Sequence, residues 1–384
     1  MGSVMDFDVT SEQQKRIDAL RTAVRLRLPG VARNSPDAHY SRDEWSAAAA
    51  LGLTGLCLPA TSGGGGLGAL DVALCLEAFG DACTDTGLVF GVAAHLLACA
   101  VPVRDFACQS LLDELLPGLA DGTLIGANAM TEPEAGSDVG ALTTTATPVD
   151  GGYVLDGVKS FASNGPVADV FVTYAVTDPA AGFLGISAFA VPRDLPGLKV
   201  GGPLPKMGLW GCPASSVEFT GCRVPARYRL GEDGQGSMIF QHSMGWERAC
   251  LFGLYLGVLA RQLRQCVEHA RTRRQFGRAI AGFQAVSHRI ADMRVRLEAA
   301  RLLVHRACWL LDGGRDHRAA AAVSKVAVAE AAIANGLDAV RVFGGAGYLT
   351  EGGVEAQLRD AVPAAIFSGT TEMQKEILTR EMGL

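Results

Sequence analysis

One loop-like segment of the sequence carries side chains that can bind a planar or phosphorylated ligand. The segment AMTEPEAGSD (129–138) combines a proline, small residues and two hydroxyls, and nothing in it suits a helix interior. Thr131 and the backbone near Met130 can donate to the carbonyl end of a ring. Ser137 follows a glycine, which permits the close approach of a phosphate or a thioester arm. A surface loop whose hydroxyls cap a turn would explain the same residues.

A second segment, KSFASNG (159–165), has the character of a strand. Phe161 and Ser163 are two residues apart and therefore share one strand face. On that face an aromatic side chain can pack against a ring while a hydroxyl bonds to one of the ring nitrogens. A strand end with an Asn-Gly turn is an equally natural interpretation of this segment alone.

Two further segments suit anionic groups. RTRRQFGRAIAGFQAVSH (271–288) places a cluster of arginines, including Arg273, just before the aromatic Phe276, as a pyrophosphate and an adenine require. RVFGGAGYLTE contains Gly344 and Gly345, whose backbone amides can face an anion. A solvated helix end and a helix C-cap are the alternative interpretations of these two segments.

Together with the later SGTTEMQ, these segments resemble the acyl-CoA dehydrogenase family in order and spacing, over residues 6–380. The resemblance implies that FAD lies between a middle and a C-terminal domain, with its adenine half bound partly by a neighbouring subunit. The residues that it assigns to the flavin ring and its surroundings are Met130, Thr131, Ser137, Phe161 and Ser163. Those that it assigns to the rest of the dinucleotide are Arg273, Phe276, Gln284, Gly344, Gly345, Thr370 and Glu372.

Oxidation of a saturated acyl thioester needs one well-placed carboxylate, because the α-proton is a weak acid. Many family members have a glutamate directly before the Gly-Thr pair near the C-terminus, where this chain has Ser368. One branch, which includes the isovaleryl-CoA dehydrogenases, carries the glutamate instead in an ERxxL-type helical segment. The matching segment of this chain, SMGWERACLFG, contains Glu247.

The residues around Glu247 agree with a catalytic role. On an α-helix Glu247 would share a largely apolar face with Ser243, Cys250, Leu251 and Leu254, and no lysine or arginine lies three or four residues away. We therefore expect desolvation to raise the pKa of Glu247, as suits a base in this reaction. We predict that Glu247 removes the α-proton, that hydride passes to flavin N5, and that Ser137, Arg248 and Ser368 contact the substrate. A solvent-facing Glu247 is the alternative.

The order of elements predicts an α+β fold that is mostly α. Helical periodicity returns after a central region of short β-type runs, which argues against alternating βαβ units. The expected domains are an N-terminal helical domain at 1–122, a middle β domain at 123–232 and a C-terminal helical bundle at 233–384. By the family resemblance the middle domain is a β-barrel, the last domain is a four-helix bundle, and the assembly is a homodimer or homotetramer.

Within the β region, the sequence predicts a hairpin that turns at Asp156-Gly157, because β-type residues flank a favourable turn dipeptide. Further predicted strands cover residues 169–177, 183–191 and 216–224.

Composition argues against several classes of protein. The net charge of -6 and the pI near 5.7 offer no field for nucleic acid or an anionic membrane. Polar residues interrupt every long apolar run, so we expect no transmembrane helix. The ten cysteines occur singly, which argues against a zinc site or disulfides. We therefore expect no metal. The N-terminus lacks the pattern of a secretory signal, so we expect a cytoplasmic protein.

The sequence thus predicts FAD-dependent α,β-dehydrogenation of an acyl thioester. Free coenzyme A is slightly favoured as the handle, but Glu247 in its GWERAC context is also similar to members that oxidise carrier-bound acyl or prolyl groups in secondary metabolism. An electron-transfer flavoprotein or oxygen would accept the electrons. The alternatives are a flavin oxidase or monooxygenase of the nitroalkane-oxidase type and, less favoured, a non-catalytic protein with the same fold.

Overall fold

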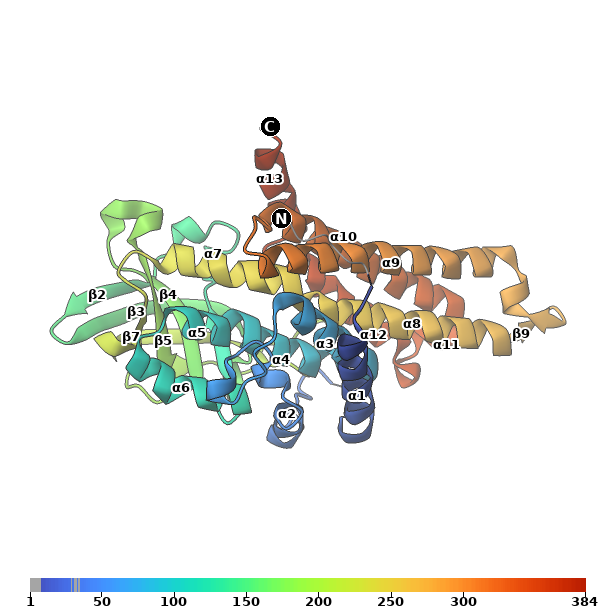
Figure 1. Ribbon diagram of the computed structural model, residues 1–384, viewed down its shortest axis with the longest axis horizontal. Helices are drawn as coiled ribbons and strands as arrows, with labels where there is room; N and C mark the ends of the chain where they lie inside the picture. The colour runs from blue at the N-terminus through green and yellow to red at the C-terminus, as the bar shows by residue number, and fades with distance from the viewer. Residues whose placement is uncertain (1–7, 29, 31–32, 34) are drawn as a thin grey trace.

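The computed structural model describes residues 8–28, 30, 33 and 35–384, and Figure 1 shows the arrangement of its helices and strands. The expectation about a secretory signal rests mainly on N-terminal residues that lie outside the described ones. The first part of the chain is helical, as expected. Its helices are α1 (Ser11–Arg27), α2 (Arg42–Ala49), α3 (Ala69–Ala82), α4 (Thr86–His95), the π-helical segment η3 (Leu96–Ala100), α5 (Val101–Phe106) and α6 (Gln109–Asp121).

Helices α4 and α5 are joined through η3 into one apolar stretch. By length and composition, Thr86–Phe106 could cross a membrane, but 94% of its most apolar window is buried inside the protein. Burial of this kind is typical of the central helix of a core, which can be apolar on every side. In this chain the stretch packs against the sheet and the later helices.

The middle part of the chain forms one mixed sheet. Its strands are β1 (Gly126–Ala129), β2 (Thr145–Val149), β3 (Gly152–Ser163), β4 (Val170–Val176), β5 (Ile186–Pro192), β6 (Leu198–Val200), β7 (Ala214–Pro225) and β8 (Arg229–Leu230). The strand order is β6-β7-β3-β2-β4-β5-β8, with β1 parallel to β4. Among the described residues no pairing joins β6 to β8, so the expected barrel is an open sheet. The reason is the length of the edge strands, which are three and two residues long.

The predicted hairpin turn at Asp156-Gly157 is wrong. β3 runs straight through this dipeptide, and Gly157 lies at a register shift opposite β7. The hairpin turns instead at Asp150-Gly151, which joins β2 to β3 as a two-residue loop. Both dipeptides favour turns, but only the first lies between two segments that pair with each other. The other predicted strands correspond to β4, β5 and β7.

The last part of the chain is again helical. It contains α7 (Gly236–Trp246), the π-helical segment η8 (Glu247–Leu251), α8 (Gly253–Thr272), α9 (Gln284–Asp312), α10 (Arg318–Phe343), α11 (Gly345–Tyr348), α12 (Val354–Ala361) and α13 (Thr371–Glu381). The small hairpin of β9 (Arg274–Gln275) and β10 (Arg278–Ala279) joins α8 to α9. Helices α8, α9 and α10 run side by side and carry this hairpin at one extremity of the molecule (Figure 1).

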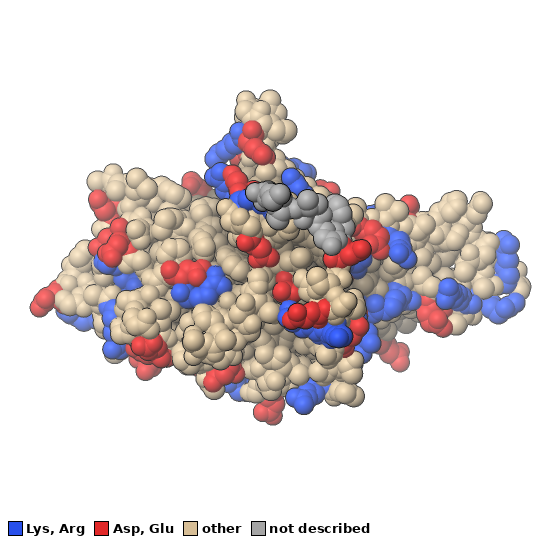
Figure 2. Space-filling view, viewed as in Figure 1, with Lys and Arg blue, Asp and Glu red and all other residues tan. Residues whose placement is uncertain are grey.

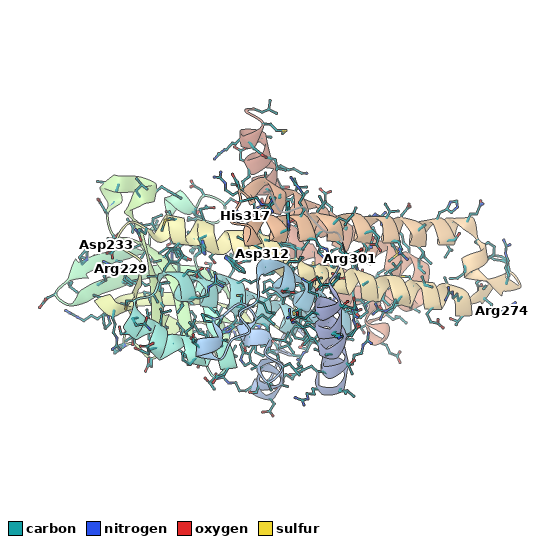
Figure 3. All side chains as sticks on the ribbon, in the orientation of Figure 1. Arg229, Asp233, Arg274, Arg301, Asp312 and His317 are labelled. Carbon is teal, nitrogen blue, oxygen red and sulfur yellow. The ribbon has the colours of Figure 1, made fainter. Side chains whose placement is uncertain are left out.

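Contacts between the N-terminal and C-terminal helices join the two helical parts of the chain. α3 packs along α8. Asp312, at the end of α9 and labelled in Figure 3, accepts hydrogen bonds from the backbone N–H groups of Ala69 (2.5 Å) and Leu70 (3.0 Å). These are the first turns of α3, where a carboxylate satisfies free amides and the helix dipole. The three parts of the chain therefore share one core.

The surface charges are mixed in sign, and most of the thiols are buried. On the face seen in Figure 2, acidic and basic side chains are interspersed. Nine of the ten cysteines are buried, with Cys108 exposed, so they pack as small core residues. Within the described part of the chain, no group of three His, Cys, Asp or Glu side chains is arranged to hold a metal ion.

Candidate active site

One cavity of about 1180 Å³ lies where the helical parts meet the sheet. Its wall is formed by the loop after β1, the end of β3, α7 with η8, the start of α10 and the segment before α13. Sequence segments that are far apart in the chain meet here. The predicted site residues that line the cavity are Met130, Thr131, Ser137, Phe161, Ser163, Glu247, Arg248, Ser368 and Thr370.

A buried ion pair holds the loop after β1 in place. Glu132 Oε1 accepts from Lys159 Nζ of β3 at 2.7 Å, and both side chains are almost completely buried. Glu132 Oε2 also accepts from the backbone N–H of Thr143 at 2.7 Å. Burial opposes ionisation of this carboxyl, but the hydrogen bonds from Lys159 and Thr144 lower the pKa of Glu132 to about 2. Glu132 is therefore an ionised anchor for Met130 and Thr131.

The opposite end of this wall is suited to a planar ring. The carbonyl of Thr131 accepts from the N–H of Ser160 at 2.7 Å, which holds the loop against β3. Phe161 has a φ of 57°, rare for a bulky residue, and its side chain is 68% exposed at the cavity. Among the described residues, none bonds to the hydroxyl of Thr131 or of Ser163. An exposed aromatic face beside free hydroxyls fits the isoalloxazine ring of FAD.

Glu247 lies in the cavity wall at the first position of η8. Its side chain is buried, with a relative exposure of 7%, and Ser368 Oγ donates a short hydrogen bond to Glu247 Oε1. Burial raises the pKa of Glu247, against the opposing effects of the Ser368 hydroxyl and the Arg248 charge. The predicted direction of the pKa is therefore confirmed, and the solvent-facing alternative is wrong. The segment is π-helical, not α-helical, and π-turns often occur at functional sites.

Ser368 is held in a conformation that points its hydroxyl at Glu247. Its φ is 57°, and its carbonyl accepts from Arg248 Nε at 2.9 Å and from Gln374 Nε2 at 3.3 Å. From the sequence no partner for Ser368 was visible, because Glu247 is distant in the chain. Arg248 thus supports the backbone of the serine that bonds to Glu247.

The cavity also has an end that is lined by the N-terminal helices. Phe90 of α4 and Phe367 have ring centroids 4.8 Å apart, and Ala94 and Ala98 line the same region. Asn128 of β1 lies there as well. None of these residues was predicted as a site residue. They belong to ordinary apolar segments, and only tertiary packing brings them to the cavity.

Six predicted cofactor residues do not line this cavity, namely Arg273, Phe276, Gln284, Gly344, Gly345 and Glu372. Phe276 is 93% exposed in the β9–β10 hairpin, the extremity where Figure 3 labels Arg274. His269 stacks on Phe343 at 4.1 Å, so the hairpin and the glycine turn lie at the same end of the bundle.

The separation between these two groups can be estimated along α10. Ala321 lines the cavity, and Phe343 is at the far end of the same helix. At a rise of 1.5 Å per residue, the helix carries them about 33 Å apart. This exceeds the length of an extended dinucleotide. One FAD molecule therefore cannot reach both the cavity and the far end of the bundle within a single chain. Glu372 is the exception among the six residues, because it lies between Thr370 and Met373, which line the cavity.

Comparison with known proteins places this architecture in a family. Residues 10–123, 127–222 and 234–383 match the families described as acyl-CoA dehydrogenase N-terminal domain, middle domain and C-terminal domain. The chain belongs to the acyl-CoA dehydrogenase family. It is an FAD-dependent oxidoreductase that dehydrogenates an acyl thioester, carried by coenzyme A or by a carrier protein.

Several members of this family are similar over their whole length. The L-prolyl-[peptidyl-carrier protein] dehydrogenase of Pseudomonas fluorescens is 51% identical over 99% of this chain and 100% of its own length. The solved structure titled PigA with FAD and proline has a TM-score of 0.94 and 43% identity, covering 99% of this chain and 100% of the other. That of the prolyl acyl carrier protein oxidase AnaB has a TM-score of 0.95 and 34% identity, covering 98% and 100%.

Proposed function

We propose that this acyl-CoA dehydrogenase family member oxidises a prolyl group held as a thioester on a peptidyl carrier protein, with Glu247 as the base. The observation that carries the proposal is the buried Glu247 carboxylate, which lines the cavity and is held by Ser368. The whole-length similarity to an L-prolyl-[peptidyl-carrier protein] dehydrogenase supports the carrier protein over free coenzyme A.

The shape of the acyl end supports a small ring as substrate. Phe90 and Phe367 pack directly against each other, with ring centroids 4.8 Å apart, and the alanines that line the same region leave room for a compact group beside this aromatic pair. A long unbranched acyl chain would need a deeper apolar channel. A five-membered ring presents its α-carbon at the start of this region, where Glu247 lies.

In the proposed reaction, the Glu247 carboxylate takes the α-proton and a hydride leaves the β-carbon, so the ring gains a double bond between these carbons. Bound FAD supplies the two-electron acceptor for that hydride. Ser368 keeps the carboxylate in one orientation, and the charge of Arg248 favours its ionised form. Removal from bulk water makes the carboxylate a stronger base than an exposed glutamate.

The residues at the far end of the bundle support an assembly in which subunits share the cofactor. We propose that Arg273, Phe276, Gln284, Gly344 and Gly345 bind the adenine–pyrophosphate half of an FAD held in a neighbouring subunit's cavity. Phe276→Ala is then expected to lower FAD retention on dilution while thermal stability of the apoprotein stays unchanged. Unchanged FAD affinity in this variant would contradict the assignment, and size-exclusion chromatography would show whether the protein is a dimer or a tetramer.

Anaerobic reduction of the bound flavin tests the reaction directly. Prolyl-carrier protein is expected to bleach the flavin absorbance faster than prolyl-CoA, isovaleryl-CoA or butyryl-CoA. If an aliphatic acyl-CoA bleaches the flavin and the prolyl thioesters do not, the substrate assignment is wrong.

The Glu247→Gln variant is expected to bind FAD but to lose substrate-dependent flavin reduction. A variant whose flavin is reduced at the wild-type rate would refute Glu247 as the base. Hydrogen peroxide formed in air would identify oxygen as the electron acceptor, whereas its absence would favour an electron-transfer flavoprotein.

A further inference from the structure

The acyl end of the cavity is apolar except at one position. α4, η3 and β1 contribute Phe90, Ala94, Ala98, Gly126 and Asn128 to its wall. In the described part of the chain, Asn128 is the one polar side chain that these three elements contribute to the cavity. A polar group in such a place contributes to specificity only if something in the cavity can pair with it.

Hydrogen bonding determines which end of the Asn128 amide is available. Asn128 Nδ2 donates to the carbonyl oxygen of Ala98 at 3.1 Å. Because a backbone carbonyl can only accept, this bond assigns the NH2 group to the helix side and leaves Oδ1 on the other side. No described residue donates to Oδ1, and the residue is only half-buried. Asn128 therefore offers a fixed, unpaired acceptor at the cavity wall.

Asn128 and Glu247 border the same part of η3. Asn128 bonds to Ala98, and burial together with the nearby Glu247 carboxylate raises the pKa of the adjacent Cys99 thiol. Ser243, one helical turn before Glu247, donates to the carbonyl of Leu97 at 3.1 Å. The acceptor and the base thus flank one short segment of backbone from two sides.

We propose that Asn128 Oδ1 accepts a hydrogen bond from the ring N–H of the substrate and so selects a cyclic α-amino acyl group over a carbocycle of the same size. This inference rests on the proposed prolyl thioester function. The ring nitrogen is bonded to the α-carbon, so holding the N–H fixes the rotation of the ring and directs the α-C–H bond at Glu247. A ring without the N–H leaves Oδ1 unpaired in an apolar wall, which penalises its binding.

The test compares two thioesters on the same carrier protein, prolyl and cyclopentanecarbonyl, in anaerobic flavin reduction. The wild-type protein is expected to prefer prolyl, and Asn128→Leu, which is similar in size but lacks the acceptor, is expected to reduce that preference by about tenfold or more. Phe90→Leu is the matched control: it alters the same wall without removing an acceptor and is expected to affect both thioesters alike. Flavin content and melting temperature verify that each variant is folded and loaded.

The outcomes separate this inference from the proposed function. If the wild type oxidises prolyl and Asn128→Leu keeps the full preference for prolyl, the role of Asn128 is refuted while the function stands. Equal rates for both thioesters with the wild type also refute it. If the wild type reduces its flavin with other thioesters but not with prolyl, the function and the inference both fail. Should Asn128→Leu not fold, Asn128→Ser, which is smaller but retains a hydroxyl that can accept a hydrogen bond, is expected to keep part of the preference. If that variant, at full flavin loading, keeps the whole preference for prolyl, the result counts against the proposal.

Discussion

Replacing Ser368 by glycine removes the one hydrogen bond that the described residues donate to the Glu247 carboxylate. Glycine removes the hydroxyl but keeps the backbone carbonyl that binds Arg248, and it tolerates the φ of 57° at this position. Burial raises the pKa of Glu247, and the Ser368 hydroxyl opposes that effect. Without the hydroxyl, the ionised carboxylate is less stable, so the pKa of Glu247 rises further.

The size of the effect follows from the type of bond. A hydrogen bond to a charged group contributes about 1.5–3 kcal/mol. If that is lost, the fraction of enzyme with an ionised base falls by about tenfold to a hundredfold at a fixed acidic pH. Because the proposed base acts in its ionised form, the loss of activity is greatest at low pH and diminishes as the pH rises above the new pKa.

Stopped-flow measurement of the rate of anaerobic flavin reduction as a function of pH tests this expectation. The acid limb of the Ser368→Gly profile is expected to move to higher pH, with the alkaline plateau close to that of the wild type. Ser368→Ala, which also lacks the hydroxyl, should move in the same direction. Superimposable wild-type and Ser368→Gly profiles at equal flavin content would show that the hydroxyl does not tune the base.

Two further predictions concern stability. Glu132→Gln leaves the buried ammonium of Lys159 without its partner and is expected to cost about 3–5 kcal/mol of unfolding free energy in urea titrations; a cost below about 1 kcal/mol would contradict the anchoring role. His95 is buried and neutral: Nε2 donates to the Leu119 carbonyl, Nδ1 accepts from the Gly126 N–H, and burial lowers the pKa of His95 to about 4 from 6.5. The unfolded state binds a proton first, so this contribution is present above pH 6.5 and about 3 kcal/mol of it is lost as the pH falls towards 4. His95→Gln should flatten that part of the curve of unfolding free energy against pH, and an unchanged slope would refute the assignment.

The broad fold could be predicted because periodicity is a local property. Helical and strand periods are visible within a few turns of chain, and the order of the three regions follows directly. Whether the sheet closes into a barrel could not be predicted from local periodicity. It depends on whether β6 and β8 are long enough to pair, and both are short. Likewise, nothing near Gly157 reveals that β7 continues to pair across it.

The residues of the candidate site also differ in whether the local sequence marks them. Thr131, Phe161 and Glu247 stand in distinctive local sequences and were found from them. Phe90 and Asn128 stand in apolar segments that differ in nothing from the rest of the core. Their positions in the cavity wall come from packing between elements that are distant in the chain, which a local pattern does not record. The pairing of Ser368 with Glu247 was missed for that reason too.

The proposed base at position 247, with a serine at position 368, illustrates what the reaction requires of the chain. The chemistry needs a carboxylate at one point in the cavity, and it does not matter which element supplies it. Here the glutamate comes from the π-helical start of η8, where the wider turn alters the direction of the side chain relative to an α-helix. A serine then occupies the place where a second carboxylate would repel the first, and donates to it instead. The smaller side chain at 368 leaves more room on that side of the cavity than a glutamate would, which suits a substrate whose α-carbon is part of a ring, as in the proposed prolyl thioester.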